Sequence, residues 1–138
     1  MAKESGLSFS VILDDSGGTA RTISNDITNL GIQMPSAQQD VTGLDKSALE
    51  RINLLADLSV TFNGVFNDAA AMSHAVFKDY RTNAGTELGR TTALAISGQT
   101  LSIAALLLTA YNLTRAADGS LTWEVPGVNC DGSISAWS

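Results

Sequence analysis

The chain of 138 residues contains one histidine and one cysteine, and these two side chains are the first candidates for chemistry. His74 lies in a segment with helical periodicity, without partners at the spacing that a catalytic triad or a metal site requires. Cys130 is followed by Asp131, whose negative charge disfavours the reactive thiolate, and no lysine or arginine stands near it in the sequence. We interpret His74 as a partly exposed structural residue and Cys130 as an inert thiol.

The carboxylates offer a second kind of chemistry, because paired acids catalyse proton transfer and clustered acids bind calcium. The run Asp14–Gly18 holds two aspartates, but its spacing is not that of an EF-hand loop and no distal glutamate completes it. The overlapping run Ser16–Thr19 lacks the lysine of a phosphate-binding loop. We therefore predict a solvated turn at Asp14–Gly18, and a protein that is not an enzyme and has no catalytic residue, cofactor or metal.

Composition and charge exclude further classes. Fourteen acidic residues and eight basic ones give a net charge of −6 and a pI near 4.4. This charge argues against a surface that binds nucleic acid or anionic lipid. The longest apolar run, Leu101–Leu108, is shorter than the roughly 20 residues that a membrane-spanning helix needs. A single cysteine forms no internal disulfide. We expect one domain over residues 1–138, assembled in a reducing cytoplasm without a membrane partner.

Alternation of polar and apolar residues predicts that most of the chain forms strands. A helix is expected only at Ala69–Arg81, where apolar residues recur every four positions and Gly85 closes the region. The alternation of the longest run breaks at Ala104–Leu106, which indicates either a bulge or a strand covered on both sides. The expected strands are Leu7–Leu13, Ile27–Met34, Ala56–Asn67, Thr91–Ser97, Thr100–Arg115 and Leu121–Val125. The segment Arg21–Asp26 is expected to be a connector between the first two.

The segment Ser36–Leu55 has two interpretations. Ser47–Glu50 fits the capping box that begins a helix, and the apolar residues after it would then form a short helical stripe. The alternative is a long hairpin arm, with an extended Gln39–Thr42 segment, a loop and a returning strand. The pattern alone does not choose between them.

One helix among seven or eight strands predicts a mainly β fold, with two packed antiparallel sheets as a sandwich or partly open barrel and one flanking α-helix. Several strands carry small or apolar residues on both faces, and a domain of this size has too little core to cover both. We therefore favour assembly with neighbouring copies over coverage by the chain's own helix and loops. The residues concerned are Ala93, Ala95, Ala104, Leu106, Leu108 and Ala110.

The order of these elements resembles a known family. The run Asp14–Thr28, the run Gln39–Gly43 leading into Ala48–Arg51, and the strand Ala56–Asn67 followed by a single helix are similar to the corresponding parts of tail tube proteins from long, non-contractile bacteriophage tails. The resemblance spans most of the chain, and it rests on the pattern of strands and turns rather than on a chemical signature.

The resemblance implies a phage tail tube-like fold that assembles as a hexameric ring, with rings stacked into a tube. One sheet of each subunit would join a continuous β-barrel around the channel. The segment at about 36–55 would be an extended arm that contacts neighbouring subunits or the next ring. The interface residues expected on it are Gln39, Asp40, Val41, Leu44, Arg51, Leu54 and Leu55.

In such a tube, DNA passes during ejection and must not adhere to the wall, so we expect acidic residues to face the channel, with Asp40 and Glu50 as candidates. The partners implied are further copies of the chain and the tape measure, tail terminator and baseplate or tip proteins of a virion tail. Alternatives are a head–tail connector, a capsid decoration protein, or a monomeric β-sandwich binding module for a ligand such as carbohydrate. That last function needs exposed aromatic residues, for which Trp137 and Tyr111 are the candidates.

Overall fold

The computed structural model describes residue 3, residues 5–81 and residues 89–138. Within these ranges the chain forms eleven β-strands, one α-helix and one short 3-10 helix (η1, Ser24–Asp26). The strands are β1 (Ser10–Asp14), β2 (Ala20–Thr22), β3 (Ile27–Gln33), β4 (Ser36–Asp40), β5 (Arg51–Ala56), β6 (Ser59–Val65), β7 (Arg90–Ile96), β8 (Gln99–Leu108), β9 (Asn112–Arg115), β10 (Leu121–Asn129) and β11 (Ala136–Trp137), and the helix is α1 (Ser73–Phe77).

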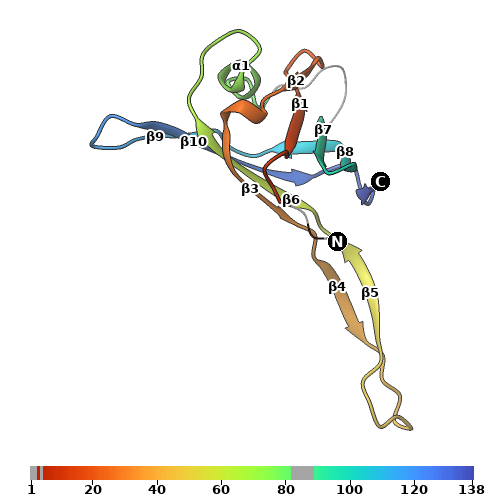
Figure 1. Ribbon diagram of the computed structural model, residues 1–138. Coiled ribbons are helices and arrows are strands. Elements are labelled where there is room, and N and C mark those ends of the chain that lie inside the picture. Colours follow the sequence, from red (N-terminus) through yellow and green to blue (C-terminus); the bar gives the residue numbers. More distant parts are fainter. Residues whose placement is uncertain (1–2, 4, 82–88) are drawn as a thin grey trace.

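The strands form two antiparallel sheets (Figure 1). Seven strands of the larger sheet follow the order β2-β1-β7-β8-β10-β6-β3, while β11 pairs with β8 and β9 with β10. The smaller sheet is the hairpin β4–β5, which projects from the body in Figure 1. The expected fold, mainly β with antiparallel sheets and one helix, is confirmed. The strand count is higher than expected because the short strands β2 and β11 were not predicted and because the expected run Thr100–Arg115 is divided into β8 and β9; β2 overlaps the expected connector Arg21–Asp26.

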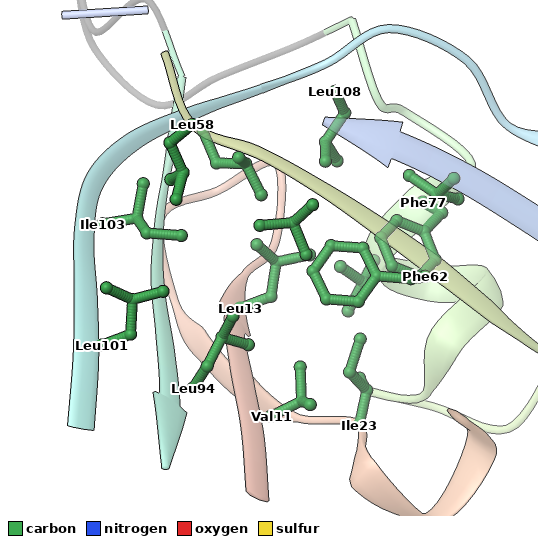
Figure 2. Close-up of a cluster of buried hydrophobic side chains, with 14 of the residues drawn as sticks. Val11, Leu13, Ile23, Leu58, Phe62, Phe77, Leu94, Leu101, Ile103 and Leu108 are labelled. Atoms are coloured by element: carbon green, nitrogen blue, oxygen red, sulfur yellow. The ribbon is translucent and has the colours of Figure 1, made fainter. Parts of the chain in front are cut away.

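The larger sheet curls around a single core (Figure 2). Leu13 of β1, near one end of the strand order, belongs to the same buried cluster as Phe62 of β6, near the other end. A flat sheet would hold these side chains several strands apart, so the sheet must bend back on itself. Leu106 and Leu108 lie inside this core, and of the expected assembly residues Ala104 is exposed while Ala93, Ala95 and Ala110 are half-buried.

Of the two interpretations of the break in the longest run, the bulge is confirmed. Arg90 of β7 lies opposite Leu106 of β8, but Thr92 lies opposite Ile103, so β8 carries one extra residue at positions 104–105. The expected run Thr100–Arg115 is nevertheless not one strand, because β8 ends at Leu108 and β9 begins only at Asn112. Thr109 follows β8 and still pairs in the register of β8 with β10, since its N–H donates to the carbonyl of Pro126 at 3.0 Å.

The helix is much shorter than the expected Ala69–Arg81, since α1 spans only five residues. Ala71 has a positive φ of 66°, which a right-handed helix cannot accommodate, and the side chain of Asn67 accepts a hydrogen bond from the N–H of Ala69 at 3.0 Å in a local turn. The expected closure at Gly85 lies outside the described residues. The apolar periodicity of Ala69–Arg81 therefore corresponds to one helical turn that buries Val76 and Phe77, and not to a long helix.

A buried carboxylate holds the start of α1. Asp26 is 2% exposed, and its two oxygens accept hydrogen bonds from the backbone N–H of Ser73 at 3.0 Å and from the side-chain amide of Asn67 at 2.9 Å. A helix of one turn is unstable on its own, so its place depends on such tertiary contacts. A negative charge also suits the positive end of the helix dipole.

A buried guanidinium holds the other end of α1. Arg90 is 2% exposed and donates hydrogen bonds to the carbonyl oxygens of Val76 and of Asp79, the latter at 2.6 Å. Burial lowers the pKa of the Arg90 guanidinium, while nearby aspartates oppose that shift. The helix is thus fixed between charges of opposite sign, each placed where the dipole favours it.

We predict that Gly64→Ala strongly destabilises the fold. A Cβ at this position of β6 would lie 2.5 Å from Cζ2 of Trp123 and closer still to the backbone oxygen of Asp26, so the core must shift. We expect a loss of about 2–3 kcal/mol in the free energy of unfolding, measured by urea denaturation of the unassembled protein. Gly31→Ala, in the neighbouring strand β3 with no atom within 4 Å, is the matched control and should be neutral or slightly stabilising. Equal stability of the two variants would contradict the packing at Gly64.

Candidate assembly surfaces

The arm and the body share one continuous antiparallel ribbon. In the body, β3 pairs with β6 up to Gln33 opposite Ser59, and in the arm β4 pairs with β5 from Ser36 opposite Ala56. Between the two sheets the N–H of Asp57 donates to the carbonyl of Pro35 at 2.8 Å. The hairpin interpretation of this segment is therefore the one that the structure has, and the helix suggested by the capping box at Ser47–Glu50 does not form.

A bulge determines which residues share a face of the arm. Ser36 lies opposite Ala56 but Gln38 lies opposite Asn53, so β5 carries one extra residue at Leu54–Leu55. Such an insertion moves the residues beyond it to the other face. As a result Val41, Ile52 and Leu54 share what we call the apolar arm face, and they are 42%, 48% and 47% exposed. Gln39, opposite Ile52, and Glu50, opposite Val41, lie on the same face. The opposite face, the polar arm face, carries Gln38, Asp40, Arg51 and Asn53.

All seven residues expected at an interface lie on this arm. Gln39 and Ile52 face each other across the hairpin, as do Asp40 and Arg51. Leu44 at the tip is fully exposed and Leu55 in the bulge is 87% exposed. The chain therefore leaves several large apolar side chains uncovered by its own residues, which is unusual for a surface without a partner.

The two acidic candidates do not form one surface. The hydroxyl and the N–H of Thr42 donate to Asp40 Oδ1 at 2.5 and 3.0 Å and lower the pKa of that carboxyl below its ordinary value. Glu50 lies opposite Val41, whose N–H donates to the Glu50 carbonyl at 2.9 Å, and its carboxylate is 3.9 Å from the ammonium of Lys46. Because Asp40 lies opposite Arg51, the register directs Asp40 and Glu50 to opposite faces of the arm.

A second surface lies on the body, on the side of β9, β10, β6 and β3 that faces away from the core. We call it the outer face. The register sets its residues in rows across the four strands, because directly paired residues share a face. The rows are Asn112, Glu124, Asn63 and Asn29; Pro126, Thr61 and Gly31; Val128, Ser59 and Gln33; and Thr114, Thr122 and Val65.

The outer face is polar and almost uncharged. Glu124 is the only ionisable side chain in these rows, and most of the others are small hydroxyls and amides. The alternation of Ser59, Thr61 and Asn63 was visible in the sequence, but the partner strands that make these residues one surface with Glu124 were not. The structure thus assembles a surface that the sequence analysis did not identify.

The outer face ends at two strands that are each paired on one side. β3 is the last strand of the sheet order, and within the described residues β9 pairs only with β10. Such edges present unpaired N–H and C=O groups that can pair with a strand of another chain. The section β9-β10-β6-β3 is therefore a four-stranded sheet that can be extended at both ends.

His74 and Tyr111 pack against each other and against neighbouring aromatic side chains. Nδ1 of His74 lies 3.1 Å from the hydroxyl of Tyr111, and the histidine ring packs 4.8 Å from the ring of Phe66, so His74 is half-buried in an aromatic cluster. Tyr111 is itself half-buried, whereas Trp137 is 44% exposed. Burial raises the pKa of the Cys130 thiol and the charge of Asp131 adds to the shift, as the sequence predicted.

The Asp14–Gly18 run is a turn, as expected. The Oδ1 atom of Asp15 accepts hydrogen bonds from the N–H groups of Gly17 and Thr19 at 2.9 and 3.0 Å, and its Oδ2 atom is 3.0 Å from Nε of Arg21. In the part of the chain that the structure describes, no three His, Cys, Asp or Glu side chains gather closely enough to hold a metal ion. No helix within the same ranges has the length and apolarity needed to cross a bilayer.

Solved structures of tail and baseplate particles include chains with this fold. The protein aligns over 99% of its length with 99% of a chain from the tail of an empty GTA particle, refined helically with C6 symmetry, at a TM-score of 0.73 and 19% identity. It aligns equally fully with a chain from the virion of a native gene transfer agent (GTA) particle, at 0.70 and 18% identity. The whole chain also covers 97% of a chain from the six-fold symmetrised baseplate of the anti-feeding prophage (AFP), at 0.62 and 10% identity. No family model and no curated protein matches the sequence.

These similarities establish the fold. The neighbours are chains of phage-like tail, virion and baseplate particles, so the expected resemblance to phage tail tube proteins is confirmed at the level of the fold. Because the identities are 19% or lower, a shared activity does not follow from the alignment alone.

The arm should be much less protected from hydrogen exchange than the core strands of the unassembled protein. Its strands have no buried side chain, whereas Val60 and Phe62 of β6 are 1% and 0% exposed. Local opening of the arm therefore breaks hydrogen bonds without exposing core. We predict that the amides of β5 exchange with deuterium at least about 100-fold faster than those of β6. Equal protection of the two strands would show that the arm is covered within a single copy.

Proposed function

We propose that this chain is the repeating structural subunit of the tail tube of a phage-like particle. In this role six copies form a ring, the rings stack into a tube, and the tube is a passive conduit for DNA. The subunit acts by binding further copies of itself and has no catalytic step. Its location is then the tail of a virion after assembly in the cytoplasm of the host, and its other partners are the tape measure, tail terminator and baseplate or tip proteins.

The observation that carries this proposal is the outer face with its two open edges. A polar face bounded by an unpaired β3 edge and an unpaired β9 edge can be continued from copy to copy. If β3 of one subunit lies beside β9 of the next, the four-stranded sections close into a barrel, which removes the edges altogether. The C6 symmetry of the GTA tail, in which a chain of the same fold occurs, supports six copies in the closed ring.

The chemistry of the outer face suits a channel for DNA. Phosphates bind to clustered lysine and arginine, and the outer face has neither in its rows. Hydroxyl and amide side chains hold water without adding positive charge, and Glu124 repels phosphate. On this proposal the carboxylate nearest to passing DNA is Glu124, with Asp40 and Glu50 on the arm rather than on the barrel wall.

The arm provides the second contact of the proposed assembly. Its apolar face exposes Val41, Ile52 and Leu54, each more than 40% accessible in the single chain. At about 25 cal/mol per Å² of buried apolar surface, burying such side chains against another copy stabilises the assembly by a few kcal/mol for each arm. The polar arm face then remains in water, as its charged and amide side chains require.

Electron microscopy of the purified protein tests the proposal directly, since rings or tubes with a central hole are expected. We predict that Ile52→Asp prevents these assemblies because it puts a charge in place of an aliphatic side chain between Val41 and Leu54 on the apolar arm face. Asn53→Asp is the matched control, since it adds the same charge to the adjacent residue of the same strand but on the polar arm face. Both variants should keep the unfolding free energy of the single chain within about 0.5 kcal/mol, because both sites are exposed.

A stable monomer at high concentration, with no ring or tube, would contradict the tail tube function and favour a binding module. Loss of assembly in Asn53→Asp as well as in Ile52→Asp would show that the two arm faces do not differ in role. Decoration of a preformed particle without ring formation would instead favour a capsid decoration protein.

The position of the outer face can be tested in the assembled tube. In a Cys130→Ser background, Asn63→Cys places a thiol in the middle of the outer face. We predict that in tubes this thiol reacts with a small maleimide but is protected from a polyethylene glycol maleimide too bulky to enter the channel. The same variant before assembly should react with both reagents. Equal reaction of the bulky reagent before and after assembly would place the outer face outside the channel.

A further inference from the structure

A groove runs along the open side of the curled sheet, between β1 and β3. We call it the seam groove. Its volume is about 450 Å³, and it is lined mainly by Phe9 and Val11 on one side and by Ile27, Leu30 and Ile32 on the other. The remaining lining residues are small or uncharged, and none of them carries a charge. The seam groove is therefore a neutral, largely apolar cleft.

The seam groove is the place where the chain's own core is incompletely covered. Phe9, Ile27, Leu30 and Ile32 pack against the buried cluster but are themselves only half-buried. Ile27, Leu30 and Ile32 lie on the core side of β3, where full burial would be expected if the sheet closed on itself. The two edges of the sheet do not pair within one copy, so these side chains remain in contact with water.

An added β-strand does not fit both walls of this groove. On the β1 wall the N–H of Val11 donates to Oγ of Ser24 at 2.8 Å, and its carbonyl accepts the N–H of Ile23 at 3.1 Å. These backbone groups are therefore already occupied by η1 and the residue before it. The chemistry of the groove favours apolar side chains that insert between the walls, and not a new ladder of hydrogen bonds.

The apolar arm face presents side chains of this kind. Val41, Ile52 and Leu54 form an aliphatic cluster that the chain itself leaves exposed, and Gln39 and Glu50 lie beside it on the same face. The arm leaves the body at the end of β3 and projects away from it (Figure 1). Residues 36–45 extend about 33 Å at roughly 3.3 Å per residue, which is enough to reach the body of an adjacent copy.

We infer that the seam groove is the receptor for the apolar arm face of a second copy of this chain. The inference rests on the proposed function, because it needs copies that are held side by side or stacked. The contact is heterologous, since the arm of one copy enters the groove of another and leaves its own groove open to a third. It covers the half-buried core residues from outside, and it leaves the hydrogen-bonding edge of β3 free to pair in the ring.

A crosslinking experiment tests this contact. In the Cys130→Ser background, Ile52→Cys and Leu30→Cys are combined in one chain, assembled, and treated with a short bismaleimide. Denaturing electrophoresis should then show a ladder of covalent oligomers, because each chain offers one arm thiol and one groove thiol. The matched control combines Asn53→Cys with Leu30→Cys, which moves the arm thiol to the polar arm face and should leave mostly single chains. Val41→Cys with Leu30→Cys repeats the test from the other strand of the arm.

The outcomes separate this inference from the proposed function. Tubes that give a ladder with Ile52→Cys or Val41→Cys, but not with Asn53→Cys, support the seam groove as the receptor. Tubes that give no ladder, or equal ladders with all three arm positions, overturn the inference and leave the tail tube function standing. Absence of rings and tubes in the unmodified protein overturns both.

Discussion

The structure depends on one long antiparallel ribbon, in which β3 and β6 form the part in the body and β4 and β5 form the arm. Core packing in the body fixes the register of the whole ribbon. In the body, Val60 and Phe62 of β6 are buried opposite Ile32 and Leu30 of β3, so a slip of one residue would turn the core side chains into solvent. The hydrogen bond from Asp57 to Pro35 carries the same register into the arm. The arm, which has no core of its own, thereby receives a defined geometry from packing that takes place at the other end of the ribbon.

Because of the bulge at Leu54–Leu55, the residues that share a face in the arm follow a different numbering pattern from those that share a face in the body. In the body, residues of even number in β6 point into the core and residues of odd number point outward. The extra residue reverses this relation in β5, so that Ile52 joins Val41 on one face of the arm and not Asp40. Without the bulge the apolar residues of the arm would be divided between both faces. One inserted residue is thus enough to make a contact surface from a strand pair whose sequence shows little alternation.

The sequence predicted the fold class, the position of the β8 bulge and most of the strands, because burial on one face leaves a period of two in residues such as Leu58, Val60 and Phe62. It overestimated α1, since the periodicity of Val76 and Phe77 does not reveal that Ala71 adopts a positive φ or that Asp26 and Arg90 fix a single turn. The outer face could not be predicted from the sequence for a different reason. Asn63 and Glu124 are 61 positions apart, and only the pairing of β6 with β10 sets them side by side.

The acidic balance of the chain does not by itself describe the surface that DNA would meet. Asp15, Asp40, Asp118 and Asp131 each accept a hydrogen bond from the N–H two residues further on, so much of the negative charge belongs to turns. Hydrogen bonds from the hydroxyl and the N–H of the residue two positions on lower the pKa of Asp40, Asp118 and Asp131, which favours their ionised form. The outer face, by contrast, has one carboxylate in its rows. For a wall that lets a polyanion pass, the decisive property is then the lack of lysine and arginine among its hydroxyl and amide side chains, and not the net charge of the subunit.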